Sequence, residues 1–228
     1  MKINANFESA VIVHALQLDW IASPMPGIDR KPLDRVGEEI ARATSIVRYA
    51  PGSQFSPHVH TGGEEFIVLE GVFQDEHADY PSGTYVRNPP QSSHTPGSKL
   101  GCIIFVKLWQ FEPQDRLQMT AKMEGVGKSH KQCLFENTHE KVSFINLLPN
   151  ETFVVKNHKG LEVFILAGEA NLQSSSETLP LAQYSWVRQP VGESFKLVAK
   201  GKVQLWLKQD HLVEVNKQVK RLGRRPTT

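Results

Sequence analysis

The hydrophobic positions of this chain fall in short runs separated by turn signals. Runs rich in Val, Ile, Phe and Tyr occupy residues 44–50, 64–73, 84–88 and 101–111. Turn signals are Pro-Gly at 26, 51 and 96, Gly-Gly at 62 and Asn-Pro-Pro at 88. Runs of this length are typical of β-strands rather than helices. The pattern therefore predicts an all-β sandwich or barrel.

One segment is ambiguous between helix and strand. Residues 38–43, EEIARA, have a composition that suits a helix. They continue without a break into the apolar run at 44–50, so we expect an extended strand there.

The second half of the chain repeats the first. EEFIVLEGVF at 64–73 resembles LEVFILAGEA at 161–170, and YVRNP at 85–89 resembles WVRQP at 186–190. The chain is thus expected to hold two copies of one β domain, joined by a polar segment without strand periodicity. The expected divisions are an N-terminal domain over 1–113, a linker over 114–139, a second domain over 140–216 and a basic tail over 217–228.

Composition narrows the class of protein. With 228 residues, 39% of them hydrophobic, the chain can bury a core, and a net charge of +2 gives no strong field toward nucleic acid or membrane. We expect neither as a partner. The basic residues near the C-terminus are interpreted as a solvated end; they are Lys217, Lys220, Arg221, Arg224 and Arg225.

Cysteine usage and hydropathy bear on location. Cys102 and Cys133 are too few for a disulfide framework, and Cys102 is expected to be a buried thiol. No secretory signal is visible, and no apolar run approaches the roughly 20 residues of a membrane helix. The sequence therefore predicts a cytoplasmic protein.

The segment 52–71, GSQFSPHVHTGGEEFIVLEG, carries the candidate chemistry. His58 and His60 are two residues apart, so on a strand both would point to one face. The Gly-Gly turn at 62 would then bring a glutamate back beside them, and His94 could enter from a third strand. Three imidazoles and one carboxylate are a complete ligand set for one transition metal ion.

Two adjacent glutamates compete for the fourth position. Glu64 and Glu65 would face opposite sides of a strand, so only one can join the histidines. In the repeat Glu65 aligns with Glu162, which has no histidines nearby, and Glu64 aligns with Leu161. Glu64 is therefore the predicted ligand and Glu65 a structural residue.

Other polar side chains are further candidates for function. Glu76, His77, Asp79 and Tyr80 could handle protons at a barrel mouth, but a hydrogen-bonded turn is the favoured interpretation. Cys102 could act as a redox trigger near the metal, although burial is favoured. The tryptophans are expected to pack the cores and the domain interface; they are Trp20, Trp109, Trp186 and Trp206.

These motifs carry a family resemblance. Residues 52–71 match the first cupin motif, G-x5-H-x-H-x3-E-x6-G, and Gly83, Pro89 and His94 match the second, with Gln91 where glycine is usual. From about Trp20 to Phe111 the sequence, including the loop DEHADYPSG, resembles the cupin domain of ChrR-type anti-sigma factors. The resemblance implies a small jelly-roll-like β-barrel with zinc held by His58, His60, Glu64 and His94.

The second half departs from that pattern. The positions of the four ligands are taken there by Val155, Asn157, Leu161 and Phe195. The resemblance thus implies a bicupin whose second copy binds no metal, with His158 an ordinary loop histidine. ChrR-type proteins also carry an N-terminal helical domain with a His-x3-Cys-x2-Cys motif. That motif is not found here, so sigma-factor capture by that route is not expected.

Three functions remain open from the sequence. The first is a zinc-binding ChrR-like sensor or regulatory module, in the response to oxidants or in anti-sigma-related control of transcription, since four protein ligands fill a tetrahedral zinc shell. The second is a dioxygenase acting on small dicarbonyl-type compounds, in which Fe²⁺, Mn²⁺ or Ni²⁺ keeps open positions. The third is a module that binds a small molecule in a metal-free barrel. Resemblance to cupins also implies a homodimer.

Overall fold

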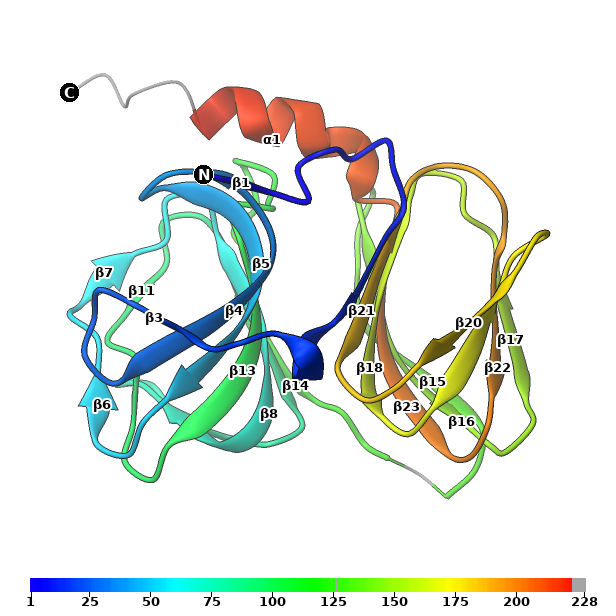
Figure 1. Ribbon diagram of the computed structural model, residues 1–228. Helices are drawn as coiled ribbons and strands as arrows, with labels where there is room; N and C mark the ends of the chain where they lie inside the picture. The colour runs from blue at the N-terminus through cyan, green and yellow to red at the C-terminus, as the bar shows by residue number, and fades with distance from the viewer. Residues whose placement is uncertain (126, 223–228) are drawn as a thin grey trace. The chain divides into compact units, whose positions relative to one another are not determined.

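The computed structural model describes residues 1–125 and 127–222, which are mostly antiparallel β-structure (Figure 1). The predicted all-β fold is confirmed. The described helical segments are the 3-10 turns η1 (Ala15–Gln17) and η2 (Leu212–Glu214) and the helix α1 (Val215–Leu222). None of the described helices is long and apolar enough to cross a membrane.

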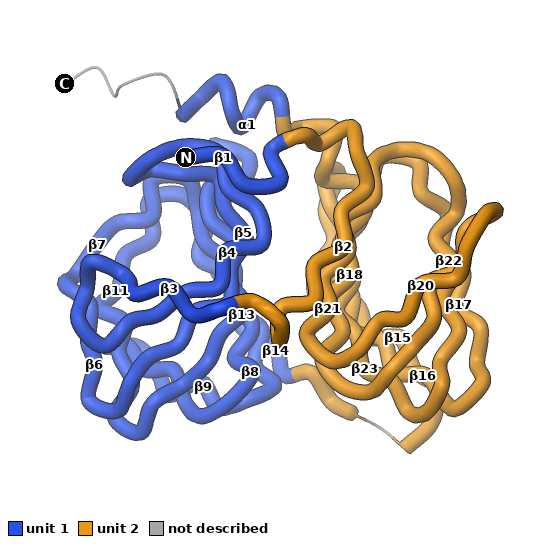
Figure 2. The backbone as a smooth tube through the Cα atoms, in the orientation of Figure 1, with its two compact units in different colours: residues 1–5, 19–122, 216–228 blue, residues 6–18, 123–215 orange. Residues whose placement is uncertain are grey.

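The chain divides into two compact units (Figure 2). Unit 1 comprises residues 1–5, 19–122 and 216–228, and unit 2 comprises residues 6–18 and 123–215. The basic residues Lys217, Lys220 and Arg221 lie in α1, and Arg221 donates a hydrogen bond to the Phe111 carbonyl at 3.0 Å. Arg224 and Arg225 lie outside the described residues.

Unit 1 is built on one large antiparallel sheet with the strand order β1-β4-β5-β13-β8-β10-β14. These strands are β1 (Lys2–Ile3), β4 (Ile28–Gly37), β5 (Ala41–Tyr49), β13 (Cys102–Leu108), β8 (Glu64–Gln74), β10 (Thr84–Asn88) and β14 (Met119–Lys122). Shorter strands complete the unit: β3 (Ile21–Ala22), β6 (Ser53–Gln54), β7 (His58–Val59), β9 (Asp79–Pro81), β11 (Ser93–His94) and β12 (Gly97–Ser98).

The core of unit 1 lies on one face of this sheet. Val47, Phe66 and Ile104 are buried there, on strands β5, β8 and β13. The segment EEIARA does not form a helix: β5 begins within it, at Ala41, as expected. Alternate residues of β5 therefore point into the unit, which places its small side chains on the inner face.

Unit 2 consists of two antiparallel sheets. The larger has the order β15-β16-β23-β18-β21-β2 and the smaller β17-β22-β19-β20. The strands are β2 (Val11–His14), β15 (His130–Glu136), β16 (Lys141–Leu147), β17 (Thr152–Val155), β18 (Leu161–Ala167), β19 (Ala170–Gln173), β20 (Thr178–Leu181), β21 (Ser185–Gln189), β22 (Phe195–Ala199) and β23 (Val203–Gln209). Leu161, Val163 and Leu205 are among the side chains that fill its interior.

The sequence repeat corresponds to a repeated pattern of strand pairing. In unit 1, β8 lies between β13 and β10; in unit 2, β18 lies between β23 and β21. The turn before each of these central strands is closed by an equivalent hydrogen bond. The Gly63 carbonyl accepts from the Trp109 N–H at 3.0 Å, and the Gly160 carbonyl accepts from the Asp210 N–H at 2.9 Å.

The segment 114–139, which the sequence suggested would lack strands, contains two. β14 pairs with β10 in unit 1, and β15 pairs with β16 in unit 2. β14 alternates between partly buried and exposed positions, and β15 does so only until it reaches the buried Leu134 and Phe135, so the hydrophobic signal of both is short and weak. Near the N-terminus, β2 pairs with β21 and so belongs to unit 2.

Candidate metal centre

Three histidines of unit 1 converge on one point. His58 on β7 and His94 on β11 lie directly opposite each other in an antiparallel pair, and His60 follows β7. One ring nitrogen from each lies within 4.8 Å of the other two. Among the described residues this is the one such cluster of possible metal ligands. The alternation expected of the His-x-His pair holds, because Val59 between them is exposed and His60 is buried.

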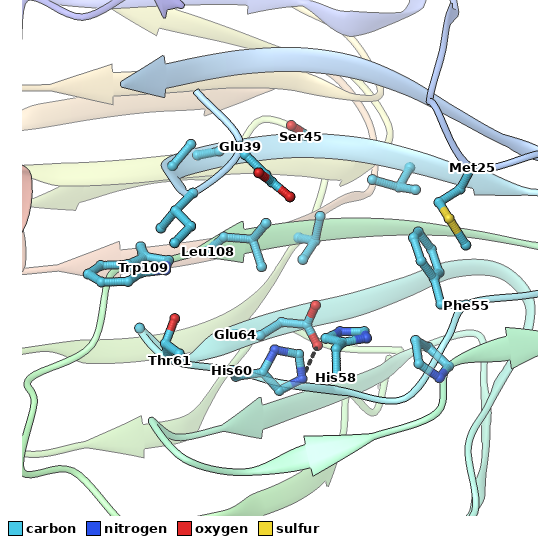
Figure 3. Close-up of a pocket in the computed structure, with 18 of the residues that line it drawn as sticks. Met25, Glu39, Ser45, Phe55, His58, His60, Thr61, Glu64, Leu108 and Trp109 are labelled. Atoms are coloured by element: carbon cyan, nitrogen blue, oxygen red, sulfur yellow. Dashed lines mark ion pairs between the residues drawn. The ribbon is translucent and has the colours of Figure 1, made fainter. Parts of the chain in front are cut away.

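Glu64 lies beside this cluster, and Figure 3 shows it next to His58 and His60. At the start of β8, its Oε2 lies 3.5 Å from His60 Nε2 and 3.6 Å from His94 Nε2. Glu65, the next residue, accepts a 2.7 Å hydrogen bond from the Tyr85 hydroxyl. The strand position therefore separates the two glutamates as predicted, with Glu64 beside the histidines.

The two buried imidazoles are left with unsatisfied nitrogens. His60 Nε2 and His94 Nε2 are inaccessible to solvent and have no hydrogen-bond partner among the described residues. Buried polar atoms are rarely orphaned, because an unmade hydrogen bond costs about 1–3 kcal/mol. Both atoms face Glu64 Oε2, so a cation between them would satisfy all three. The residues therefore fit a bound metal ion.

The protonation states also suit a metal. Burial, and then the charge of His58, lowers the pKa of His60 to about 4. Burial likewise lowers the pKa of His94, although Glu64 opposes this. Both imidazoles are neutral at pH 7, which is the form that binds metal. The close approach of His60 to Glu64 is thus not an ion pair at neutral pH.

Burial has the opposite effect on the carboxyl group. It raises the pKa of Glu64, and the nearby His94 and His58 offset this only in part. Desolvation disfavours the charged carboxylate when no cation is present. A metal ion at the point where the three histidines meet would supply the missing positive charge.

Hydrogen-bond partners behind the cluster orient the histidine rings and the Glu64 carboxylate. His94 Nδ1 lies 3.1 Å from Asp75 Oδ2, and His58 Nδ1 lies 3.0 Å from the Ser56 carbonyl. Hydrogen bonds from these Nδ1 atoms leave the Nε2 atoms free to bind an ion. Asn88 donates to Glu64 Oε2 at 3.4 Å.

Sequence reasoning missed Asp75 and Asn88 as parts of the site. The sequence points instead to the neighbours of Asp75 in the same loop, and those neighbours form the predicted hydrogen-bonded turn. Asp75 Oδ1 accepts from the His77 and Ala78 N–H groups, and Glu76 accepts from the Thr95 N–H at 2.7 Å. Asp75 could have been found from the loop DEHADYPSG, which begins with it and is part of the family resemblance.

A cavity of about 540 Å³ opens onto the histidines. Its lining includes His58, His60 and Glu64 on one side and apolar residues such as Met25, Phe55, Leu108 and Trp109 on the other (Figure 3). The cavity exists partly because Ala41, Ala43 and Ser45 on β5 have small side chains. Its volume is in the range that suits small-molecule ligands.

The two cysteines of the chain, Cys102 and Cys133, are not among the residues of this cluster. Cys102 is buried on β13, and burial raises the pKa of its thiol to about 11. It is therefore a protonated, unreactive thiol at neutral pH, in accord with the favoured interpretation. Cys133 is exposed on β15 in unit 2.

The equivalent positions of unit 2 hold no metal ligands. Val155 on β17 lies opposite Phe195 on β22, as His58 lies opposite His94 in unit 1. Leu161 and Phe195 are buried in the apolar core, and Asn157 donates to the Pro190 carbonyl at 2.6 Å. His158 is exposed.

Comparison with known proteins finds a family match in the first half of the chain. Residues 8–112 match the family described as the ChrR cupin-like domain. No curated protein matches the sequence significantly.

Solved structures with cupin folds resemble the whole chain at low sequence identity. The Escherichia coli protein Ylba matches with a TM-score of 0.70 at 11% identity, over 90% of this chain and 92% of that one. Bacterial pirin YhhW from E. coli, solved with nickel(II), matches with a TM-score of 0.66 at 13% identity, over 88% and 98%. A variant of salicylate 1,2-dioxygenase from Pseudoaminobacter salicylatoxidans matches with a TM-score of 0.58 at 9% identity, over 88% and 77%. At these identities the likeness shows the fold.

Proposed function

Because residues 8–112 match the family of the ChrR cupin-like domain, we propose that unit 1 holds the metal centre of a cupin dioxygenase. The ion would be Fe²⁺, Mn²⁺ or Ni²⁺, held by His58, His60, Glu64 and His94. The substrate would be a small dicarbonyl-type compound that enters the cavity. Such an ion, when bound, supplies the Lewis acidity and redox chemistry that oxygen transfer requires.

The cavity beside the ligands is the observation that supports catalysis over a closed structural site. A structural zinc site is filled by four protein ligands and needs no access for other molecules. Here a space of about 540 Å³ borders His58, His60 and Glu64. His58 is partly exposed, whereas His60 and His94 are buried. The open side of the cluster therefore faces a volume large enough for a substrate.

The protein's own residues would prepare this site before substrate arrives. Asp75 fixes the proton of His94 on Nδ1, and the Ser56 carbonyl does the same for His58. Asn88 holds the carboxylate of Glu64 from one side. The apolar wall that includes Phe55 excludes water from a substrate bound at the ligands.

Oxygen uptake tests this proposal. Protein loaded with Fe²⁺ is supplied with pentane-2,4-dione and related dicarbonyls, and uptake should rise in proportion to bound iron. His60→Ala should abolish uptake, while His158→Ala, an exposed histidine of unit 2, should leave it unchanged. Zinc as the native metal, with no uptake by the iron-loaded protein, would contradict the proposal.

A zinc-binding regulatory module is the second candidate, and the family match favours it. The family is named for the cupin-like domain of ChrR, and four protein donors also suit tetrahedral zinc. This alternative predicts stoichiometric zinc in the native protein and no turnover. The metal analysis and uptake assay above separate the two candidates.

The remaining predictions concern the whole chain. We propose that unit 2 is a second cupin barrel that binds no metal, so that the chain is a bicupin with one working site. Its repeated strand pairing and its apolar replacements at the ligand positions support this. The homodimer, the cytoplasmic location and the domain division of the sequence analysis stay predictions, and size-exclusion chromatography and limited proteolysis can test the first and the last. The compact units of the structure differ from that division, since residues 6–18 belong to unit 2 and residues 216–222 to unit 1.

A further inference from the structure

The metal ligands are not the only charged groups in the cavity. Arg30 lies on β4 opposite Val47 of β5, and Val47 lies opposite Ile104 of β13. Directly opposed residues share a face of the sheet. Val47 and Ile104 belong to the core of unit 1. Arg30 is therefore on the inner face, and it lines the same cavity as the histidines.

Arg30 has no partner of opposite charge. Its side chain is partly buried and makes no ion pair or hydrogen bond with any described residue. The second arginine of the cavity, Arg35, differs because its guanidinium donates to the Glu38 carbonyl. A guanidinium in a partly buried, largely apolar setting is costly unless an anion accompanies it.

An aromatic wall leads from the metal ligands toward Arg30. The ring of Phe55 lies 6.1 Å from that of His58 and 5.6 Å from that of Tyr49, centre to centre. Tyr49 pairs on β5 with Ile28, which is two residues before Arg30 on β4. Figure 3 shows Phe55 between Met25 and the histidine cluster. A ligand along this wall would reach both ends of the cavity.

The electrostatics of Tyr49 agree with this placement. Its pKa is raised, first by burial and then by the negative charge of Glu64, while the positive charge of Arg30 opposes the increase. The pKa of the Tyr49 phenol therefore depends on the charges of both Glu64 and Arg30. Burial, followed by the charge of Arg35, lowers the pKa of Arg30, but a guanidinium remains charged at neutral pH. A bound anion would oppose both of these influences on Arg30.

We propose that the cavity takes a small organic carboxylate, with its carboxylate on Arg30 and oxygen atoms at its other end on the metal. The inference rests on the proposed metal centre of unit 1 and specifies its substrate class. A charge-assisted pair with arginine is directional and strong, so it would select acids over neutral compounds of the same shape.

Two-ended probes test this arrangement without turnover. A hydroxamate binds the metal, and a chain of two to four methylenes carries either a carboxylate or a carboxamide; these are the monohydroxamates of succinate, glutarate and adipate and their amides. Dissociation constants are measured by calorimetry on zinc-loaded protein at fixed salt. Acetohydroxamate, which has only the metal-binding end, reports whether the site is intact.

For the best chain length, the carboxylate probe should bind about tenfold or more tightly than its amide. Arg30→Gln should reduce that ratio to near one, and Arg30→Lys should keep part of it. Arg35→Gln is the matched control from the same strand and should keep the full ratio. Acetohydroxamate should bind all four proteins equally.

Contrary outcomes are distinct. A ratio near one for every chain length in the wild type would overturn the inference, and so would a ratio lost in Arg35→Gln but kept in Arg30→Gln. If acetohydroxamate fails to bind the metal-loaded wild type, both the metal centre and the inference fail. Carboxylate preference without oxygen uptake by the iron-loaded protein, when it is supplied with dicarbonyl compounds that carry a carboxylate as well as with pentane-2,4-dione, would refute the dioxygenase and retain the carboxylate site.

Discussion

The two units of this protein keep the same strand pairing but differ completely at four side chains. His58 and His94 of unit 1 face each other across β7 and β11, and Val155 and Phe195 face each other at the equivalent place in unit 2. The backbone pattern thus survives without the ligands. In this fold, strand pairing and metal binding depend on separate sets of residues.

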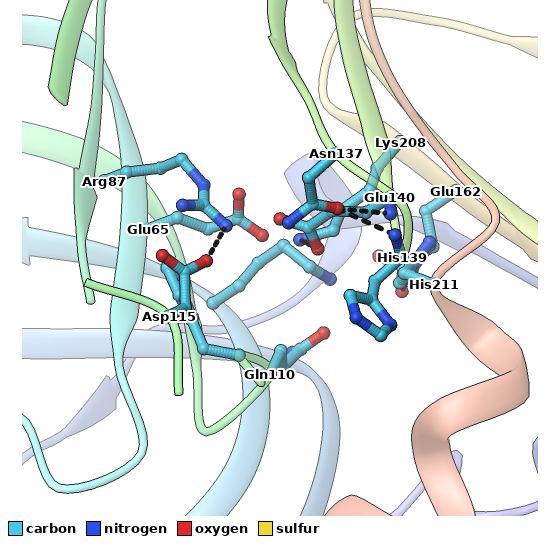
Figure 4. Close-up of polar contacts among 12 residues, drawn as sticks. Glu65, Arg87, Gln110, Asp115, Asn137, His139, Glu140, Glu162, Lys208 and His211 are labelled. Carbon is cyan, nitrogen blue, oxygen red and sulfur yellow. Dashed lines mark hydrogen bonds and ion pairs between the residues drawn. The ribbon is translucent and has the colours of Figure 1, made fainter. Parts of the chain in front are cut away.

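Both units share a group of buried charged residues on equivalent strands. In unit 1, Glu65 lies opposite Arg87 and Lys107; its carboxylate accepts from Tyr85, and Arg87 pairs with Asp115 at 3.0 Å (Figure 4).

Unit 2 has the same three residue types at the same register. Glu162 lies opposite Arg188 and Lys208, and its carboxylate binds His211 at 2.9 Å and Trp186 at 3.0 Å. Because each buried charge needs partners, these residues are difficult to change singly. Their presence in both units, while the candidate metal ligands occur in unit 1 alone, assigns them to the fold.

The largest effect is expected from giving unit 1 the residues of unit 2. His94→Phe and Glu64→Leu introduce the side chains found at Phe195 and Leu161. Each should abolish stoichiometric metal binding, because the remaining donors are too few for a tight site. Elemental analysis of purified protein measures this. His158→Ala should keep the metal, and full metal content in both ligand variants would place the ion elsewhere.

The next largest effect tests what the two units share. Gly71 and Gly168 have φ of +71° and +85°, and an added Cβ would lie 2.2 Å and 2.1 Å from the carbonyl oxygens of Gly101 and Lys202. Alanine at either position should cost roughly 3 kcal/mol in the free energy of unfolding, since backbone strain and a clash combine. Denaturant unfolding measures both variants.

Gly52 provides the control for this comparison. Its φ is +77°, but an added Cβ would meet nothing within 4 Å. Gly52→Ala should therefore cost only about 1 kcal/mol, from the backbone conformation alone. Equal losses in all three variants would show that the close carbonyl contacts do not matter.

Acid should destabilise unit 1 through a histidine that unit 2 lacks. The folded pKa of His60, about 4, lies below its ordinary value of 6.5, so the unfolded chain takes up the proton first as pH falls. Stability is therefore full above pH 6.5 and declines below it, by about 2 kcal/mol at pH 5. The raised pKa of Glu64 acts in the opposite direction as pH falls, so the contribution of His60 is isolated by comparing two proteins that both keep Glu64.

His60→Asn introduces the residue of unit 2, Asn157, and should remove this part of the pH dependence. Unfolding free energies of wild type and variant are compared at pH 7.5 and 5 with a chelator present. Identical pH dependence in the two proteins would mean that His60 is not held neutral by burial.

The smallest effect concerns the support behind a ligand. Asp75→Asn should weaken metal binding about tenfold, because the amide orients the His94 ring less firmly and adds no negative charge. Asp79→Asn is the matched control, since Asp79 bonds Gln74 at 2.6 Å and touches no ligand. Competition with a chromophoric chelator measures both. Equal metal affinities for Asp75→Asn and Asp79→Asn would mean that Asp75 does not support metal binding.

The sequence predicted those features that depend on local periodicity. The His-x-His spacing places His58 and His60 correctly, and comparison with the repeat separates Glu64 from Glu65. It could not predict Asp75 or Asn88, because their contacts depend on where a loop and a strand end pack against the histidines. It also missed β14, whose partly exposed polar residues carry little hydrophobic pattern.

Arg30 shows the same limit more clearly. In the sequence it lies among the charged residues of IDRKPLDR and resembles any exposed arginine. Only the register of β4 against β5 places it opposite Val47 and inside the cavity. Strand register joins residues far apart in the chain, and a single sequence does not specify it for a strand of mixed polarity.

X-ray absorption spectroscopy of the natively bound metal tests the central claim most directly. We predict one ion per chain of a first-row transition metal, coordinated by three imidazole nitrogens and the Glu64 carboxylate, with at least one exchangeable water facing the cavity. Binding of acetohydroxamate should displace that water. An ion with a closed shell of four protein ligands, or one without histidine nitrogens, would contradict the account.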